Sequence, residues 1–332
     1  MKIACICSTK NEGDIIEAFV RLNGKVCDSF FFADESTDNT REIIGLLKKE
    51  GYDLNFLPKP RSGHNQPNST RVLIAAVIKT ARPDWIFLLD ADEIIVAKDK
   101  QELLAEMNET APGTYLAAPW KTYVPTNLGY FESESPLSEC FALRREVDEP
   151  FRKISFSRSL APDIVPAAGN HSGKSHAGAI IVERTARSYH LAHFPVRSPE
   201  QIIVKNLIAM HNLMARVDAL KSEGTHVFPV ADLIRARSYK LTLDDLQNLA
   251  INYASRVPEP DIAANALEFR DEPQLKTQLN YLDLGRINAL ARLDLEIERL
   301  SKEVRMMRRG FKLESLTFKE FKGDGISQAA RV

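Results

Sequence analysis

Short apolar segments alternate with amphipathic segments over the first hundred residues, and this alternation restricts the fold more than any other feature of the sequence. The predicted strands are residues 2–8, 29–33, 53–57 and 85–90, and the predicted helices are residues 14–22, 38–50 and 69–80. Repeated strand and helix units favour a mostly parallel sheet with helices on both faces. In such sheets ligands bind beyond the carboxyl ends of the strands, where we expect Ser8, Asp34 and Asp90.

The pattern changes in the middle of the chain. From residue 113 to residue 195, short predicted strands are separated by loops rich in proline, glycine and serine. From residue 199 onward the sequence is predicted to be mainly helical, with a first helix over residues 199–217 and a polar, loop-broken segment over residues 241–278. An α/β domain is therefore predicted to continue into a region of short strands and then into a helical extension.

Near the carboxy terminus, apolar residues recur at alternating steps of three and four. They form a short coiled-coil-like seam within residues 287–309 and are Leu290, Leu293, Ile297, Leu300, Val304 and Met307. This seam is equally compatible with packing against its own domain and with homodimerisation. The basic cluster that follows contains Arg305, Arg308, Arg309 and Lys312. Such a cluster is typical of a solvated helix end, and contact with a membrane surface is the less favoured alternative.

The charge balance argues against a nucleic-acid partner. The 332 residues include 44 basic and 45 acidic side chains, which gives a formal net charge of -1. The first residues contain only a short apolar run. No later stretch reaches the roughly 18 apolar residues that a membrane span needs. We therefore expect a cytoplasmic protein without a membrane span, and the basic cluster is the candidate for peripheral contact with the inner membrane face.

Three carboxylates lie within four residues at the end of the last predicted strand of the first hundred residues: Asp90, Asp92 and Glu93. So dense a negative cluster repels itself, and a divalent cation relieves the repulsion. Mg²⁺ and Mn²⁺ prefer carboxylate oxygens and keep coordination positions open for phosphate. An isolated Asp-x-Asp more often caps a helix or turn, but its position at the end of an apolar strand favours a metal site.

A second polar segment, residues 34–40, follows the second predicted strand. Ser36 or Thr37 suits the cap of the next helix, and Asp38 suits its first turn. Capping does not account for Asp34 at the strand end. There a carboxylate can accept the imide hydrogen of a uracil or form a hydrogen bond with a ribose.

These segments occur in the order and spacing of family 2 glycosyltransferases, and the sequence resembles a GT-A enzyme of that family. The matching segments are Cys7-Ser8-Thr9-Lys10-Asn11-Glu12, Asp34 to Thr40, Arg71 and Leu88-Leu89-Asp90-Ala91-Asp92. The resemblance implies a nucleotide-sugar donor site at Thr9, Asn11, Glu12, Asp34, Arg71, Asp90 and Ala91, with Asp92 as a metal ligand. The sequence departs from the family pattern at Ala33 and Glu35, where many relatives carry aspartate and glycine. The nucleotide base therefore stays open.

A third segment, residues 189–201, resembles the His-Phe-Pro-x-Arg-Ser segment of family 2 enzymes related to bacterial surface-polysaccharide assembly. In many GT-A enzymes a histidine after the Asp-x-Asp motif completes the metal site, and imidazole is a suitable ligand for Mn²⁺. His190 and His193 face opposite sides of an ideal strand, so one of them is expected to reach the metal, and the motif favours His193. Arg197 and Lys205 either neutralise the diphosphate or form salt bridges at the start of a helix.

The resemblance implies inverting glycosyl transfer to a glycan or lipid-linked acceptor, with Mn²⁺ or Mg²⁺ as cofactor. The predicted organisation is a GT-A domain over residues 1–200, divided into a nucleotide-binding half (1–112) and an acceptor and metal half (113–200), followed by a helical extension (201–332). The catalytic base must lie across the sugar from the metal. Glu134 and Glu139 are the candidates, although acidic loop residues are usually ordinary surface acids.

Two alternatives remain open. A GT-A-like nucleotidyltransferase needs a glycine-rich phosphate loop after the first strand, and this sequence has only Gly13 there. A non-catalytic GT-A scaffold would keep the fold and use the seam to assemble partner enzymes. The joint presence of the predicted donor and metal residues argues against a scaffold.

Overall fold

The computed structural model describes residues 1–57, 66–146, 151–215, 227–253, 267–286 and 288–310, with the backbone alone for residues 66–69, 215, 289 and 302–310. The strands are β1 Ile3–Thr9, β2 Ser29–Asp34, β3 Leu54–Phe56, β4 Trp85–Leu89, β5 Glu93–Ala97, β6 Thr114–Val124, β7 Leu143–Arg145, β8 Arg152–Ser157, β9 Ile164–Pro166, β10 Gly173–Ser175, β11 Val182–Thr185, β12 Tyr189–His193 and β13 Leu267–Phe269. The helices are α1 Ile16–Asn23, α2 Thr40–Lys49, α3 Gln66–Ala81, α4 Lys100–Asn108, α5 Pro136–Glu139, α6 Pro199–Ala215, α7 Val227–Ala236, α8 Leu243–Ile251, α9 Leu282–Gly285 and α10 Ala289–Gly310.

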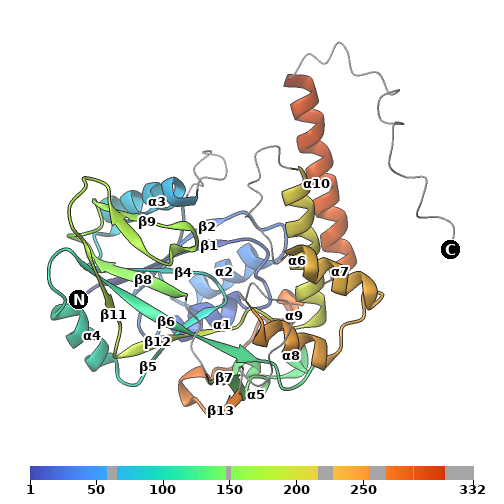
Figure 1. Cartoon of the computed structure of the whole chain (residues 1–332), viewed down its shortest axis with the longest axis horizontal. Coiled ribbons are helices and arrows are strands. Elements are labelled where there is room, and N and C mark those ends of the chain that lie inside the picture. The colour runs from blue at the N-terminus through green and yellow to red at the C-terminus, as the bar shows by residue number, and fades with distance from the viewer. Residues whose placement is uncertain (58–65, 147–150, 216–226, 254–266, 287, 311–332) are drawn as a thin grey trace.

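The main sheet has a parallel half and a mixed half (Figure 1). Strands β3, β2, β1 and β4 lie side by side and run parallel. The sheet continues beyond β4 through β8, β6, β7 and β13, each antiparallel to its neighbour. Strand β12 runs parallel to β6 and antiparallel to β5. The predicted α/β fold with a mostly parallel central sheet and a helical carboxy-terminal part is confirmed, and the antiparallel strands follow the predicted change of pattern at residue 113.

The two faces of the parallel half are covered by different helices. Ile3, Cys5 and Cys7 of β1 pack in one apolar cluster with side chains of α1, α2 and α4. The alternate residues Ala4 and Ile6 pack in a second cluster with side chains of α3. Burial on both faces explains why these strands are apolar at every position and not only at every second one.

The helices α6, α7 and α8 form a third apolar cluster, and α10 lies against α6 and extends beyond the sheet (Figure 1). The residues of the predicted seam all belong to helix α10. Leu293 packs against the α6 cluster, whereas Leu290 and Ile297 are exposed. The seam is therefore partly used within the chain, and homodimerisation stays a prediction. Within the described residues, no helix combines the length and the apolar character needed to cross a membrane.

The chain returns to its amino-terminal part after α8. The carboxylate of Glu17 in α1 accepts hydrogen bonds of 2.7 Å from the backbone N–H groups of Asn280 and Tyr281. Gly285 lies against Gly13, so closely that a Cβ atom on Gly285 would be 1.9 Å from the Gly13 carbonyl oxygen. This part of the predicted extension thus packs on the first forty residues, and the predicted division at residue 200 stays a prediction.

The Gly285→Ala variant is expected to lower the free energy of unfolding by about 1–3 kcal/mol, because the new methyl group must displace backbone and not a flexible side chain. Gly45→Ala is the matched control, since a Cβ at Gly45 meets nothing within 4 Å and alanine stabilises a helix interior by roughly 0.5–1 kcal/mol. Urea unfolding measures both variants. If Gly285→Ala is as stable as the parent protein, the close packing of these two segments is wrong.

Candidate active site

Two loops that leave neighbouring strands are joined at the carboxyl edge of the sheet. Thr9 ends β1 and lies opposite Asp34, the last residue of β2. The Thr9 hydroxyl donates to Asp34 Oδ1 at 2.9 Å, and Ser36 donates to the same oxygen from both its backbone N–H and its hydroxyl. We call residues 9–14 and 34–40 the paired loops.

The paired loops hold each other through side chain to backbone hydrogen bonds. The Asn11 N–H donates to Ser36 Oγ at 2.8 Å, and the Thr37 N–H donates back to Asn11 Oδ1 at 2.8 Å. The Gly13 N–H donates to Asp38 Oδ2 at 3.1 Å. Asn11 has a φ of 59°, a left-handed conformation that asparagine tolerates better than most residues. The paired loops therefore form one hydrogen-bonded unit, which includes the predicted donor residues Thr9, Asn11, Glu12 and Asp34.

The segment Asp90-Ala91-Asp92 forms a tight turn between β4 and β5. The turn is closed by two hydrogen bonds: the Glu93 N–H donates to the Asp90 carbonyl oxygen at 3.1 Å, and the Asp90 N–H donates to Glu93 Oε2 at 2.8 Å. Asp90 is 44% exposed, whereas Asp92 and Ala91 are buried. The turn thus directs two carboxylates to different environments, one accessible and one enclosed.

His193 lies beside this turn because β12 pairs with β5. His193 is opposite Glu93 in the register, and the Phe194 N–H donates to the Asp92 carbonyl oxygen at 2.9 Å. The buried imidazole stacks on Trp120 with 4.2 Å between ring centroids. His190, three residues earlier, has its Nε2 3.7 Å from Glu272 instead. The predicted opposite orientation of the two histidines agrees with these contacts.

Charges around Asp92 favour its ionised form. Burial is the largest single influence and would raise the pKa of Asp92, but the cations Lys205 and Arg197 lower it below its usual range. The Lys205 ammonium is 3.2 Å from Asp92 Oδ2, and Arg197 Nη1 is 3.8 Å from it. Burial lowers the pKa of His193 to about 4, so the imidazole is neutral at pH 7. A carboxylate anion and a neutral imidazole are the forms in which these residues ligate metals.

Arg197 connects the metal candidates to the paired loops. Its side chain is almost fully buried, and its Nε and Nη2 donate to the two oxygens of Asp14 at 2.7 and 3.1 Å. Nη2 also donates to Glu12 Oε2 at 2.9 Å, and Nη1 donates to the Phe194 carbonyl oxygen at 3.0 Å. Burial raises the pKa of Glu12 to about 7. Arg197 was predicted either to neutralise the diphosphate or to form salt bridges, and its described contacts are salt bridges and hydrogen bonds within the protein.

Lys153 is a site residue that sequence reasoning missed. It lies on β8, is fully buried, and its Nζ is 2.5 Å from Asp90 Oδ2 and 3.3 Å from Glu93 Oε1. Burial would lower the pKa of Lys153, but Asp90 and Glu93 raise it above its usual value. The ammonium therefore stays charged and holds Asp90 in place. Position 153 carries no motif in the sequence that could have signalled this role.

The other predicted site residues lie apart from this cluster in their described contacts. Arg71 on α3 has its Nη1 3.3 Å from His176 Nδ1. Glu134 and Glu139 are exposed; Ser133 donates to Glu139, and the Glu134 carbonyl oxygen accepts from Leu279. Their role as catalytic base stays a prediction.

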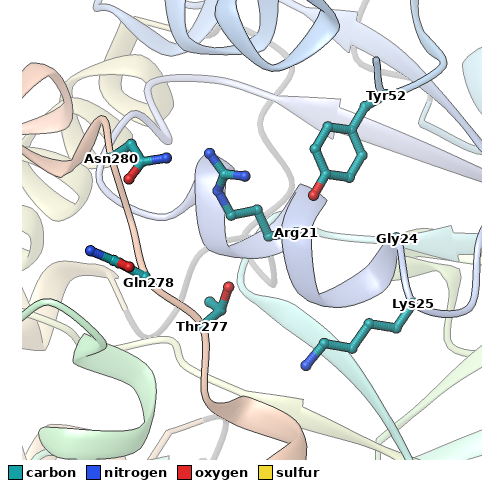
Figure 2. Close-up of a pocket in the computed structure, with 7 residues that line it drawn as sticks. All are labelled: Arg21, Gly24, Lys25, Tyr52, Thr277, Gln278 and Asn280. Atoms are coloured by element: carbon teal, nitrogen blue, oxygen red, sulfur yellow. The ribbon is translucent and has the colours of Figure 1, made fainter. Parts of the chain in front are cut away.

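A separate pocket of about 530 Å³ lies between the end of α1 and the returning segment (Figure 2). Its lining residues are Arg21, Gly24, Lys25, Tyr52, Thr277, Gln278 and Asn280. Arg21 is paired with Glu17 and Glu50. None of the predicted donor, metal or catalytic residues lines this pocket, so it is distinct from the candidate active site.

Comparisons with known proteins give one family match and several similar folds. Residues 5–157 match the model of glycosyl transferase family 2. No curated protein matches the sequence. Among solved structures, S. aureus TarS (a fragment of residues 1–349) is 15% identical, with 76% of this chain and 78% of that chain covered and a TM-score of 0.36.

Two further solved structures are similar at lower coverage of this chain. Glucosyl-3-phosphoglycerate synthase from Mycobacterium tuberculosis, in complex with Mn²⁺, UDP and glucosyl-3-phosphoglycerate, is 16% identical, with 48% and 57% of the two chains covered and a TM-score of 0.29. A 4-diphosphocytidyl-2C-methyl-D-erythritol synthase is 13% identical, with 56% and 90% covered and a TM-score of 0.32.

The family match runs through β1, β2 and β4 to the end of β8, and so includes the paired loops, the Asp90 to Asp92 turn and Lys153. His193, Arg197 and Lys205 lie beyond it but contact the same turn. The match to the glycosyl transferase family 2 model thus covers residues 5–157, a little under half of the chain, and the α/β fold is of the GT-A type.

Proposed function

We propose that this protein is an inverting glycosyltransferase that moves a sugar from a nucleoside diphosphate sugar to a hydroxyl group of a glycan or lipid-linked acceptor. The observation that carries the proposal is that β12 brings the buried His193 beside the turn that holds the buried Asp92, at the carboxyl edge of a sheet that matches glycosyl transferase family 2. This edge is where open α/β sheets bind their ligands.

The nucleoside is assigned to the paired loops. Asp34 Oδ1 is engaged by Thr9 and Ser36, whereas the buried Oδ2 receives no hydrogen bond within the described residues. Arg41 approaches Oδ2 only at 3.7 Å, as an ion pair. A buried acceptor without a donor is costly, so Asp34 Oδ2 is suited to accept an N–H or O–H group of the nucleoside.

We assign a divalent cation to the site beside Asp92 and His193, which would be its protein ligands. Among the described residues, no group of three or more His, Cys, Asp and Glu side chains is arranged to hold a metal. Two protein ligands leave positions for phosphate oxygens and water, so we expect the metal to bind together with the nucleotide and not alone. When bound, Mn²⁺ or Mg²⁺ supplies positive charge where the departing diphosphate becomes more negative.

Two lysines complete the proposed donor site in different ways. Lys205 is 41% exposed while its Nζ lies 3.2 Å from Asp92, so it is available to a diphosphate. Lys153 is buried and holds Asp90, which we assign to the ribose as the family resemblance implies. Arg197 is assigned to support of the site, because its donors are directed to Asp14, Glu12 and Phe194.

The assignments on the acceptor side come from the sequence. Glu134 and Glu139 remain the proposed bases for the acceptor hydroxyl. A role in cell-surface polysaccharide synthesis, a cytoplasmic location, homodimerisation through α10 and contact of the basic cluster with a membrane are likewise proposals. Of that cluster, Lys312 lies outside the described residues.

The proposal predicts that a nucleoside diphosphate and Mn²⁺ together raise the melting temperature more than the sum of their separate effects. A ligand at one hundred times its Kd stabilises by about 2.7 kcal/mol, which is roughly 4 °C for a chain of this size. The measurement is a thermal-shift screen of UDP, GDP, CDP and dTDP with and without Mn²⁺ or Mg²⁺.

The matching nucleoside monophosphates are the control, because they lack the diphosphate that completes the metal site. They are expected to give a smaller, metal-independent shift. If none of the diphosphates stabilises the protein under any metal condition, the donor site is wrong, and a scaffold without activity becomes the better interpretation.

A further inference from the structure

The carboxy-terminal helix α10 contacts the paired loops directly through Arg292. Arg292 Nη2 is 2.5 Å from Asp38 Oδ2, and Nη1 donates to the Asn11 carbonyl oxygen at 3.4 Å. The side chains of Arg292 and Asp38 are only 8% and 4% exposed. A buried pair of opposite charges is little screened by water, so loss of either partner leaves an uncompensated charge.

Asp38 is one of the residues that join the two loops. Its Oδ2 accepts the Gly13 N–H, and its Oδ1 accepts the backbone N–H and the hydroxyl of Thr40 at 3.0 and 2.5 Å. The Thr40 hydroxyl oxygen in turn accepts the Glu12 N–H at 2.9 Å. Arg292 therefore neutralises a carboxylate that holds residues of both loops.

Other contacts from the same part of the chain reach the same loops. Glu296, one turn after Arg292, has its Oε1 3.6 Å from Lys10 Nζ. Asn39 donates to the Leu284 carbonyl oxygen at 2.8 Å, in addition to the backbone contact between Gly285 and Gly13. Residues of α9 and α10 thus contact both loops at several points.

We propose that Arg292 is a positioning residue for the donor: it fixes the paired loops in the arrangement that binds the nucleotide, so that the carboxy-terminal part of the chain sets donor affinity. This inference rests on the proposed function, which assigns the nucleoside to the paired loops. Without the ion pair the buried Asp38 carboxylate has lost its counter-charge, and the loops are held less firmly in this arrangement. The fraction of molecules competent to bind falls, and the apparent Kd rises by the same factor.

The Arg292→Met variant is expected to raise the Kd of the nucleoside diphosphate by about tenfold, measured by calorimetry with whichever of UDP, GDP, CDP or dTDP binds the parent protein in Mn²⁺. The KM for the donor sugar is expected to rise while kcat changes less than twofold, since Arg292 touches no reacting group. Arg292→Lys keeps the charge and is expected to restore most of the affinity. Unchanged affinity in Arg292→Met overturns the inference.

Arg237→Met is the matched control. Arg237 pairs with the buried Asp245 at 3.0 Å, also in the carboxy-terminal part, but contacts neither paired loop. Its loss is expected to lower stability without changing nucleotide affinity. Equal losses of affinity in Arg237→Met and Arg292→Met would show a general structural effect and overturn the specific role of Arg292.

Hydrogen exchange of the ligand-free protein separates this inference from the proposed function. Arg292→Met is expected to speed exchange of the Asn11, Glu12 and Gly13 amides by about tenfold, with no change in Arg237→Met. Unchanged exchange there overturns the positioning role even when the parent protein binds nucleotide. The third outcome is that Arg292→Met speeds exchange of these amides while the parent protein binds no nucleoside diphosphate. That result supports the mechanical link between α10 and the loops, and it contradicts the assignment of the loops to a donor.

Discussion

Replacing Asp92 by asparagine is expected to abolish glycosyl transfer and the metal-dependent part of nucleotide stabilisation. Asp92 is the only carboxylate of the turn that is both buried and adjacent to His193 among the described residues, and its neighbours keep it ionised. Asparagine keeps the shape but removes the charge that a hard cation needs. A metal supplies several kcal/mol at the departing diphosphate, so activity should fall about a thousandfold or more. Donor turnover and thermal shifts with and without Mn²⁺ measure the two effects.

Asp99→Asn is the matched control for this variant. Asp99 caps α4 by accepting the Gln101 N–H at 2.8 Å, and asparagine caps helices about as well as aspartate. The same chemical change seven residues later is therefore expected to leave activity and metal-dependent stabilisation unaltered. If Asp92→Asn retains the parent protein's shift with Mn²⁺ and nucleotide, the assignment of the metal to Asp92 is wrong.

Much of the site followed from the sequence because the first strands are parallel. Thr9 and Asp34 are 25 residues apart in the sequence, yet the register of β1 and β2 places them opposite each other. The register of β1 with β4 aligns Cys7 with Leu89, so that Asp90 follows at the same edge. Strand ends in a parallel sheet meet by geometry alone, and the pattern of apolar segments was enough to predict it.

The antiparallel part of the sheet was not predictable in the same way. Lys153 reaches Asp90 because β8 inserts between β4 and β6. No local pattern in the sequence encodes how these strands pair. Nor does one show which face of the sheet a lysine occupies when polar and apolar residues alternate around it. A buried lysine needs carboxylate partners, and the partner Asp90 lies 63 residues earlier in the sequence.

In the carboxy-terminal part, the sequence contained a signal for the start of α8 that was missed, but no signal for the contact between Gly285 and Gly13. Residues 241–278 were expected to be loop-broken, but α8 begins there with a capping box in which Thr242 and Asp245 exchange hydrogen bonds. Thr-x-x-Asp before an apolar run is a helix-start signal that the sequence did contain. The return of Gly285 to Gly13 leaves no such signal, because it joins segments that are distant along the chain.

The second large effect is expected from Arg197→Met, which should lower the free energy of unfolding by about 3–5 kcal/mol. Arg197 and Asp14 are each 1% exposed, and Glu12 shares the same guanidinium. Methionine nearly preserves the volume but leaves the buried Asp14 and the partly buried Glu12 without this cation. For a chain of this size the loss corresponds to a fall in melting temperature of roughly 4–7 °C. Urea unfolding and thermal melts measure the effect.

The pH dependence and a double variant test whether charge is the cause. Without Arg197 the pKa of Glu12, already raised to about 7, is expected to rise further. A carboxyl group whose pKa is higher in the folded than in the unfolded protein destabilises the fold increasingly as the pH rises. The loss of stability in Arg197→Met should therefore be smaller at pH 5 than at pH 8.

A double variant tests the same charge interaction. Asp14→Asn should lower the free energy of unfolding less in Arg197→Met than in the parent protein, since the two residues share one interaction. Arg235→Met, which breaks an exposed pair on α7, should change stability by no more than about 0.5 kcal/mol. A pH-independent deficit with additive double-variant effects would mean that Arg197 acts by packing, and that Glu12 and Asp14 are not held by its charge.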